Sequence, residues 1–106
     1  MESIQFENVT VAAKANIYFD GGVVSHTVCF PDGSRKTIGL IYPGRYTFNT
    51  GVPERMEIIV GKSRVRMAGE DGWTDYCAGT AFSVPGNSSF EIAVDEAIAE
   101  YVCSYE

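Results

Sequence analysis

Residues that favour turns recur at nearly even intervals along this 106-residue chain, and short runs rich in Val, Ile, Tyr, Phe and Thr fill the gaps. The turn positions are Asp20-Gly21-Gly22, Asp32-Gly33, Pro43-Gly44, Gly61-Lys62, Gly69 to Gly72, Ala78-Gly79, Pro85-Gly86 and Asp95-Glu96. Short strands separated by turns every ~8–12 residues are typical of β-sandwiches and barrels. No segment carries a convincing helical period, so the sequence predicts an all-β protein. Its length predicts a single domain over residues 1–106.

Alternation along the expected strands assigns residues to faces, because successive side chains of a strand point in opposite directions. The apolar residues that share an inward face are Met56, Ile58 and Val60, then Phe82 and Val84, then Phe90, Ile92 and Val94. Glu54 falls in register with the first of these sets. A carboxylate directed into a β cavity is either paired or functional, whereas one at a loop end is simply solvated, and the sequence leaves both interpretations open.

Charge excludes some partners. The chain has 8 Lys and Arg against 14 Asp and Glu, a net charge of −6, which argues against a nucleic-acid partner, since binding nucleic acid favours a basic face. No apolar run approaches the ~20 residues of a membrane span, so no membrane partner is expected. The first residues, Met1 to Gln5, lack the basic and apolar regions of a signal peptide, and a cytoplasmic location is expected.

Cysteine and histidine usage excludes other classes of site. Cys29, Cys77 and Cys103 are an odd set with no C-x-x-C pair, which suits neither a disulfide framework nor a zinc knuckle. We expect them to be small buried hydrophobic residues. His26 is the only histidine, so a site that needs two or three imidazoles is excluded. We expect His26 to be a surface or half-buried strand residue.

Two segments resemble the paired motifs of the cupin superfamily, PGRYTFNTGVPERMEIIVG at 43–61 and GTAFSVPGNSSF at 79–90. In the second segment, Gly79 is followed by Pro85 and, five residues later, by Phe90, where a metal-binding cupin has histidine. In the first segment, Thr50 and Val52 stand near the positions of the two cupin histidines.

Glu54 stands seven residues before Gly61, which is the spacing of the cupin glutamate. It is the one ligand-type residue kept at the four ligand positions, and a single carboxylate cannot hold a transition metal. The resemblance therefore implies a single cupin-type jelly-roll barrel without a metal site.

Further stretches narrow the resemblance to one family over nearly the whole chain. They are ANIYFDG at 15–21, KTIG at 36–39, YTFNT at 46–50, PERM at 53–56 and FSVPG at 82–86. Together they look like the pyrimidine/purine nucleoside phosphorylase family of small cupin-fold proteins. The resemblance implies a pentosyl-transferring enzyme of the glycosyltransferase class. It would convert purine and pyrimidine nucleosides to free base and α-D-ribose 1-phosphate, with inorganic phosphate as co-substrate and no cofactor.

That chemistry suggests roles for particular side chains. The rings of Tyr46, Phe48, Phe82 and Phe90 would line the cavity and give flat contact to base or ribose, although each could equally be an ordinary core aromatic.

The polar roles fall to a second group of residues. Glu54 would bind ribose hydroxyls and steady cationic character at the sugar, with the Thr50 hydroxyl beside it. Arg35 is the first candidate for phosphate and Arg45 the second, because a guanidinium fork fits phosphate oxygens, while a solvated surface charge is the alternative for both. Ser88, in the turn at 85–88, would offer a hydroxyl and backbone N–H groups.

Three other functions fit parts of this pattern. A metal-free cupin that binds a small molecule without catalysis would suit the same aromatic cavity. A cupin isomerase would need metal ligands that the chain lacks, and a purely structural barrel would bind no ligand. A homodimer is expected, because the chain is small and has open strand edges, with the segment Ser3 to Val11 at the interface.

Overall fold

The computed structural model describes residues 4–106, and strands dominate it. The strands are β1 (Thr10–Val11), β2 (Asn16–Tyr18), β3 (Val23–Cys29), β4 (Arg35–Ile41), β5 (Gly44–Asn49), β6 (Glu54–Val60), β7 (Lys62–Met67), β8 (Thr74–Cys77), β9 (Ala81–Val84), β10 (Ser89–Val94) and β11 (Ala99–Tyr105). A single 3₁₀ turn, η1 (Phe19–Gly21), follows β2. Among these residues, no helix is long and apolar enough to span a membrane. The all-β prediction is confirmed.

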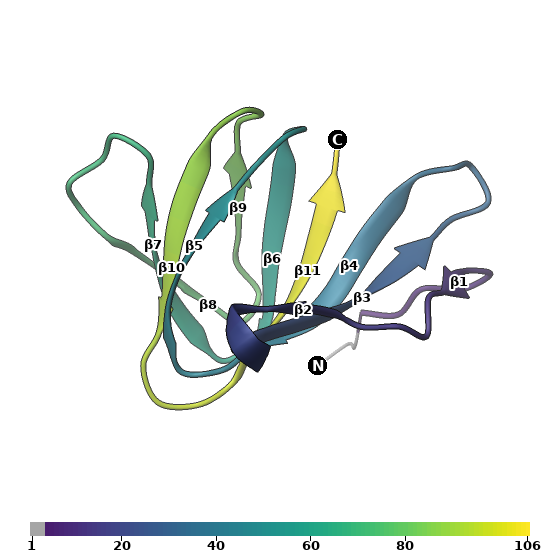
Figure 1. The fold of residues 1–106 in the computed structure, drawn as a ribbon, viewed down its shortest axis with the longest axis horizontal. Helices are drawn as coiled ribbons and strands as arrows, with labels where there is room; N and C mark the ends of the chain where they lie inside the picture. Colours follow the sequence, from purple (N-terminus) through teal and green to yellow (C-terminus); the bar gives the residue numbers. More distant parts are fainter. Residues whose placement is uncertain (1–3) are drawn as a thin grey trace.

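The strands form two antiparallel sheets, which Figure 1 shows side by side. The larger sheet has seven strands in the order β1-β3-β4-β11-β6-β9, with β2 also paired to β3. The smaller sheet has four strands in the order β5-β10-β7-β8. Within residues 4–106 no strand pairing joins one sheet to the other, so the prediction of a closed barrel is wrong. Both sheets keep open edges, and side-chain packing holds them together.

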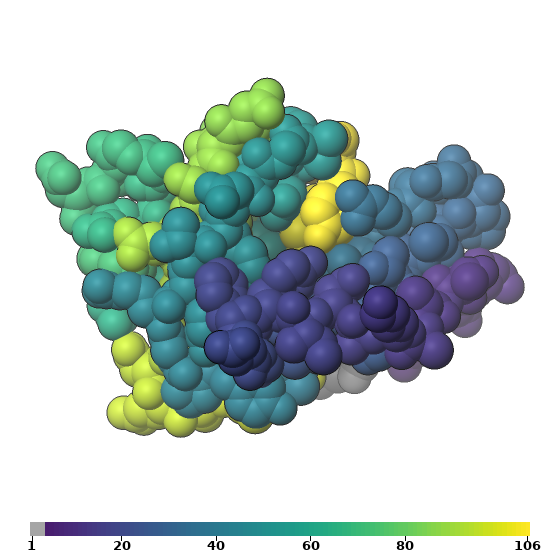
Figure 2. Space-filling model, viewed as in Figure 1, coloured from purple at the N-terminus to yellow at the C-terminus, as the bar shows by residue number. Residues whose placement is uncertain are grey.

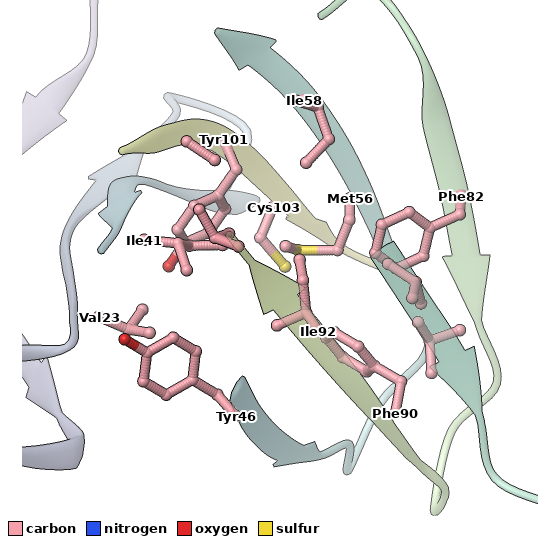
Figure 3. Packing of buried hydrophobic residues seen from close by; sticks show 14 residues of the cluster. Val23, Ile41, Tyr46, Met56, Ile58, Phe82, Phe90, Ile92, Tyr101 and Cys103 are labelled. Carbon is pink, nitrogen blue, oxygen red and sulfur yellow. The ribbon is translucent and has the colours of Figure 1, made fainter. Parts of the chain in front are cut away.

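The hydrophobic core lies between the two sheets. Figure 3 shows Met56 from β6 and Tyr101 and Cys103 from β11 beside Phe90 and Ile92 from β10. Ile92 is fully buried and Phe90 is 2% exposed. Other side chains on the inner faces of the two sheets line a cavity at one end of the core.

The predicted inward residues are buried with one exception. Met56, Ile58, Phe82, Val84, Phe90, Ile92 and Val94 are all in the core. Val60, predicted to be inward, is 45% exposed. A register shift between Glu100 and Tyr101 of β11, opposite the end of β6, breaks the alternation there. A β-bulge of this kind is invisible to a strict two-residue period.

The cysteine prediction is correct for one residue of three. All three are free thiols, but only Cys103 is buried, while Cys29 and Cys77 end strands at the surface. His26 is half-buried on β3, as expected, with its Nδ1 3.1 Å from the Ala12 carbonyl oxygen. Of the predicted interface segment 3–11, Ser3 lies outside the described residues. Residues Thr10 and Val11 form β1, which pairs with β3.

Truncating a side chain at the centre of the inter-sheet core tests this packing. We expect Ile92→Ala to lower the free energy of unfolding by about 2–5 kcal/mol, because the deletion leaves a cavity that the two sheets cannot close. Ile17, on β2 and 65% exposed, supplies the control, and Ile17→Ala should change the free energy by less than about 0.5 kcal/mol. Urea unfolding measures both, and equal losses would contradict the core placement.

Candidate active site

A cavity of about 280 Å³ opens between the two sheets, at the end where β4 and β6 begin and β11 ends. We call it the inter-sheet cavity. The residues that line it are Tyr18, Ser25, Arg35, Thr37, Ile41, Phe48, Asn49, Glu54, Met56, Phe90, Tyr101, Cys103 and Tyr105. Figure 2 shows the last residues of the chain, in yellow, beside a notch next to the β3–β4 hairpin. The volume is at the lower end of the range for ligand pockets, which suits a small molecule.

Glu54 provides the carboxylate of the inter-sheet cavity. It is the first residue of β6, where it pairs with Tyr105 of β11 on one side and Val84 of β9 on the other. The Cys103 thiol donates a hydrogen bond to Glu54 Oε1, with a sulfur–oxygen distance of 3.3 Å. Burial raises the pKa of the Glu54 carboxyl above its usual value of 4.5, and the thiol and the charge of Arg35 oppose that shift.

Arg35 provides the cation of the same cavity. It begins β4, and its guanidinium carbon lies 4.1 Å from the centre of the Tyr105 ring, a cation–π contact. No carboxylate of residues 4–106 lies within 4.0 Å of this guanidinium, whereas Arg55, Arg64 and Arg66 each have an acidic partner. The Arg35 guanidinium therefore keeps its capacity to bind an anion.

Aromatic rings form the opposite wall. Phe48 stacks on Phe90 with ring centres 5.6 Å apart, and Tyr18 meets Phe48 edge-on at 6.0 Å. The turn η1 carries Phe19 against Phe48 at 5.3 Å, although its φ of 53° puts a bulky residue in the left-handed region. Packing against the wall compensates for that backbone strain. The result is an apolar wall of packed rings in the same cavity as one carboxylate, Glu54, and one guanidinium, Arg35.

The structure brings four of the nine predicted site residues together. Arg35, Phe48, Glu54 and Phe90 line the inter-sheet cavity, although they come from both sheets. Their roles toward substrate stay predictions.

Two predicted aromatic site residues, Tyr46 and Phe82, lie outside the lining of the inter-sheet cavity. The Tyr46 hydroxyl donates hydrogen bonds to the Tyr42 and Pro43 carbonyl oxygens at 2.9 and 3.2 Å, which fixes the turn before β5. Phe82 packs in the core between Tyr76 and Phe90. Neither ring lines the inter-sheet cavity, because the cavity occupies one end of the sandwich and these rings fill its body.

Thr50 and Ser88 also lie outside the cavity lining, where they join two loops. The Thr50 hydroxyl donates to the Pro85 carbonyl oxygen at 2.6 Å and accepts from the Ser88 backbone N–H at 2.9 Å. Arg45 points away from the core, because it alternates with buried Tyr46, and it lies over the Trp73 ring at 4.9 Å. These three residues do not line the inter-sheet cavity, and their contact with substrate stays a prediction.

Several residues that line the cavity were not predicted as site residues from the sequence. Tyr101, Cys103 and Tyr105 alternate along the inner face of β11, and Thr37 follows Arg35 by two positions on β4. The pattern Y-x-C-x-Y was a usable signal, since every second residue shares a face. Nothing in the sequence showed that this face meets Glu54, because Cys103 and Glu54 are 49 residues apart in the chain. Within residues 4–106 no three His, Cys, Asp or Glu side chains gather in a group that could hold a metal ion.

Solved structures define the class of the fold. A cupin-superfamily protein from Desulfitobacterium hafniense covers 78% of this chain and 76% of its own, with a TM-score of 0.64 at 13% identity. A variant of Bacillus subtilis oxalate decarboxylase has a TM-score of 0.70 at 18% identity and covers 97% of this chain but 28% of its own. At such identities the likeness concerns the fold alone, which is cupin-type.

Closer relatives define the family. The model of the pyrimidine/purine nucleoside phosphorylase family matches residues 13–105. The pyrimidine/purine nucleoside phosphorylase of Cupriavidus necator is 61% identical over 99% of both chains. That of Methylobacillus flagellatus is 59% identical over 96% of this chain and 98% of its own. A protein of unknown function from an Acinetobacter species is 51% identical, with a TM-score of 0.93 over 96% of this chain and 98% of its own. The chain belongs to the pyrimidine/purine nucleoside phosphorylase family.

From the raised pKa of Glu54 we predict how the free energy of unfolding depends on pH. A carboxyl whose pKa is higher in the folded state favours folding while protonated, and this advantage is lost as the pH rises through the folded-state pKa. We expect Glu54→Gln to be more stable than the parent at about pH 8, and the gap to close towards about pH 4. Urea unfolding across this range measures the effect.

Glu96 is exposed in the β10–β11 turn, so Glu96→Gln is the matched control and should show no such pH-dependent gain. A Glu54→Gln protein that is less stable than the parent at high pH would show that the ionised carboxylate stabilises the fold.

Proposed function

We propose that this protein catalyses phosphorolysis of purine and pyrimidine nucleosides, with base and α-D-ribose 1-phosphate as products. The observation that carries the proposal is that Arg35, which has no acidic partner within residues 4–106, and a half-buried Glu54 line one aromatic-walled cavity. The names of its relatives support it, since they are pyrimidine/purine nucleoside phosphorylases. The proposal includes no metal and no cofactor, and it keeps the cytoplasmic location that the sequence predicts.

The proposed reaction combines phosphate attack, departure of the base and growth of positive charge on the ribose. A phosphate oxygen attacks the anomeric carbon and forms the new C–O bond while the bond to the base nitrogen breaks. The bonding electrons leave with the base, which takes up a proton from water or a donor. Positive charge grows on the ribose in between, as in glycoside hydrolysis. In our assignment Arg35 holds phosphate and ionised Glu54 orients ribose hydroxyls and stabilises the cationic sugar.

The aromatic wall accounts for acceptance of both base classes. Every base has a π-face, so a ring that stacks on it tolerates purines and pyrimidines alike. Phe48 forms the wall from β5, and Tyr18, which is 43% exposed, extends it towards solvent. The larger base can therefore project past the end of the wall instead of requiring a deeper cavity.

Release of free base from uridine and inosine, with and without inorganic phosphate, tests the function. We expect base and ribose 1-phosphate to form in equal amounts only when phosphate is present. Replacing Arg35 with Ala should raise the KM for phosphate by roughly tenfold or more with a smaller change in the KM for nucleoside, because a charge-assisted contact is lost. Arg45→Ala, which removes a cation outside the inter-sheet cavity, is the matched control.

Other outcomes of the same assay discriminate between the functions. Nucleoside-induced stabilisation without any base release would identify a non-catalytic binding module. A larger effect of Arg45→Ala than of Arg35→Ala would move the phosphate site out of the inter-sheet cavity. Normal turnover in Glu54→Gln would remove the carboxylate from the mechanism.

The proposal also includes a homodimer. The outer face of the larger sheet carries an apolar groove of about 710 Å³. Its apolar lining includes Ile4, Phe6, Val9, Val11, Val24, Ile38, Leu40, Ile59 and Val102. Within residues 4–106 no second sheet packs on this face, although the inner face of the same sheet packs on the smaller sheet. A second copy of the chain would bury the groove, and the N-terminal segment that flanks it would take part.

Light scattering tests the homodimer. We expect a mass of twice 11.6 kDa for the parent. Ile38→Glu should give the monomer mass, because Ile38 is 37% exposed in the groove and a charge there opposes burial. Val52, 46% exposed in the β5–β6 loop, is the control, and Val52→Glu should keep the parent's mass. A monomeric parent protein would contradict the proposal.

A further inference from the structure

The last strand presents three side chains to the inter-sheet cavity, and two of them contact the candidate catalytic groups. Tyr101, Cys103 and Tyr105 alternate along the inner face of β11. Figure 3 shows Tyr101 and Cys103 directed into the space between the sheets. Cys103 contacts Glu54, and Tyr105 contacts Arg35. The proposed chemistry, as assigned above, uses neither of them.

Cys103 holds the carboxylate. Within residues 4–106 its thiol is the group that donates a hydrogen bond to Glu54, at 3.3 Å. Cys103 is 2% exposed, and burial raises the pKa of its thiol to about 12, so the S–H proton stays in place at neutral pH. Pairing of Cys103 with Met56, two residues along β6 from Glu54, fixes the donor beside the acceptor. A thiol that keeps its proton is a directional donor to one carboxylate oxygen.

Tyr105 holds the guanidinium. Its ring covers one face of Arg35 at 4.1 Å, which leaves the N–H groups at the edge of the guanidinium free to meet an anion. The Tyr105 hydroxyl lies 3.3 Å from the Thr37 hydroxyl, and Thr37 is 4% exposed. An acidic partner would also orient Arg35, but it would occupy the same N–H groups and neutralise their charge. A ring avoids both effects.

We infer that Cys103 and Tyr105 are positioning residues: Cys103 orients the Glu54 carboxylate towards ribose, and Tyr105 orients Arg35 towards phosphate. The inference rests on the proposed function and assigns to β11 the alignment of the two halves of the site. The two roles can be tested separately, because Cys103 contacts Glu54, assigned to ribose, whereas Tyr105 contacts Arg35, assigned to phosphate.

Other groups in the cavity also act on Glu54. The titratable or charged groups that line the inter-sheet cavity with it are Arg35 on β4, Tyr101, Cys103 and Tyr105 on β11, and Tyr18 on β2. Val84, its partner on β9, and Phe48 and Asn49, which line the cavity from β5, carry no charge. Of these groups, Cys103 and Arg35 favour the ionised carboxylate, and burial opposes it.

A pH–rate profile tests the role of Cys103. Cys103→Val removes the donor and keeps an apolar side chain of similar size. We expect it to move the acidic limb of kcat/KM to higher pH by about half a unit or more, because the ionised Glu54 loses a hydrogen bond. Cys103→Ser keeps a donor, and its limb should stay at or below the parent position. Profiles of both variants that coincide with the parent profile would overturn the role.

Substrate-specific kinetics test the role of Tyr105. Tyr105→Leu removes the ring, and we expect the KM for phosphate to rise about fivefold or more while the KM for nucleoside changes less than twofold. Tyr105→Phe keeps the ring and should lie between the two, which keeps the test open should the leucine variant fold poorly. A purely structural role predicts equal changes in both KM values or none, and either result would overturn the assignment.

The parent protein separates this inference from the proposed function. Base release by the parent only with phosphate, together with unchanged kinetics in all four variants, would overturn the positioning roles and leave the function intact. A parent protein without phosphate-dependent release would overturn both.

Discussion

The place of β11 between β4 and β6 is the constraint on which the rest of the structure depends. The final strand of the chain completes the middle of the larger sheet, as Figure 1 shows, and joins strands that begin at Arg35 and Glu54. Without β11, these two residues would lie on strands with nothing between them. With it, their side chains line the same cavity at one end of the sandwich. The candidate site is therefore a product of long-range pairing, which makes the C-terminal residues part of it.

The inter-sheet cavity contains one cation, Arg35, and one acid, Glu54, which form no direct ion pair with each other. Elsewhere the sheets use ion pairs, such as Arg64 with Asp95 and Arg66 with Glu91 on the smaller sheet. In the cavity, a ring supports Arg35 and a thiol supports Glu54. Such supports orient a charged group but satisfy it less fully than a counterion does, and burial still raises the pKa of Glu54 although the thiol and Arg35 oppose that shift. A substrate with hydroxyl groups and a negatively charged co-substrate would supply what is missing.

Local patterns in the sequence predict the strands and most of the core, because turn residues and two-residue alternation are properties of neighbouring positions. They fail at Val60, where an extra residue in β6 shifts its register against β11, and at the barrel, since closure depends on pairing between distant strands. Resemblance to a family singled out Glu54, and the chemistry that the resemblance implies suggested Arg35 as a phosphate ligand of the same site. Thr50 and Arg45 show its limit: a motif position does not reveal which way a side chain points or what it already contacts.

The two faces of the larger sheet differ in what packs on them, and this difference bears on how such a small chain could keep an open cavity. A sandwich of this size has little core to spare, and each residue that lines a cavity contributes less to packing than one that fills the interior. Ile92 and Phe90 are buried in the body of the sandwich. The hydrogen bonds of the Thr50 hydroxyl join the two loops beside its open end. An apolar outer face covered by a second copy would add buried area without touching the cavity. Stability and function would then be drawn from opposite faces of one sheet, with β11 serving both.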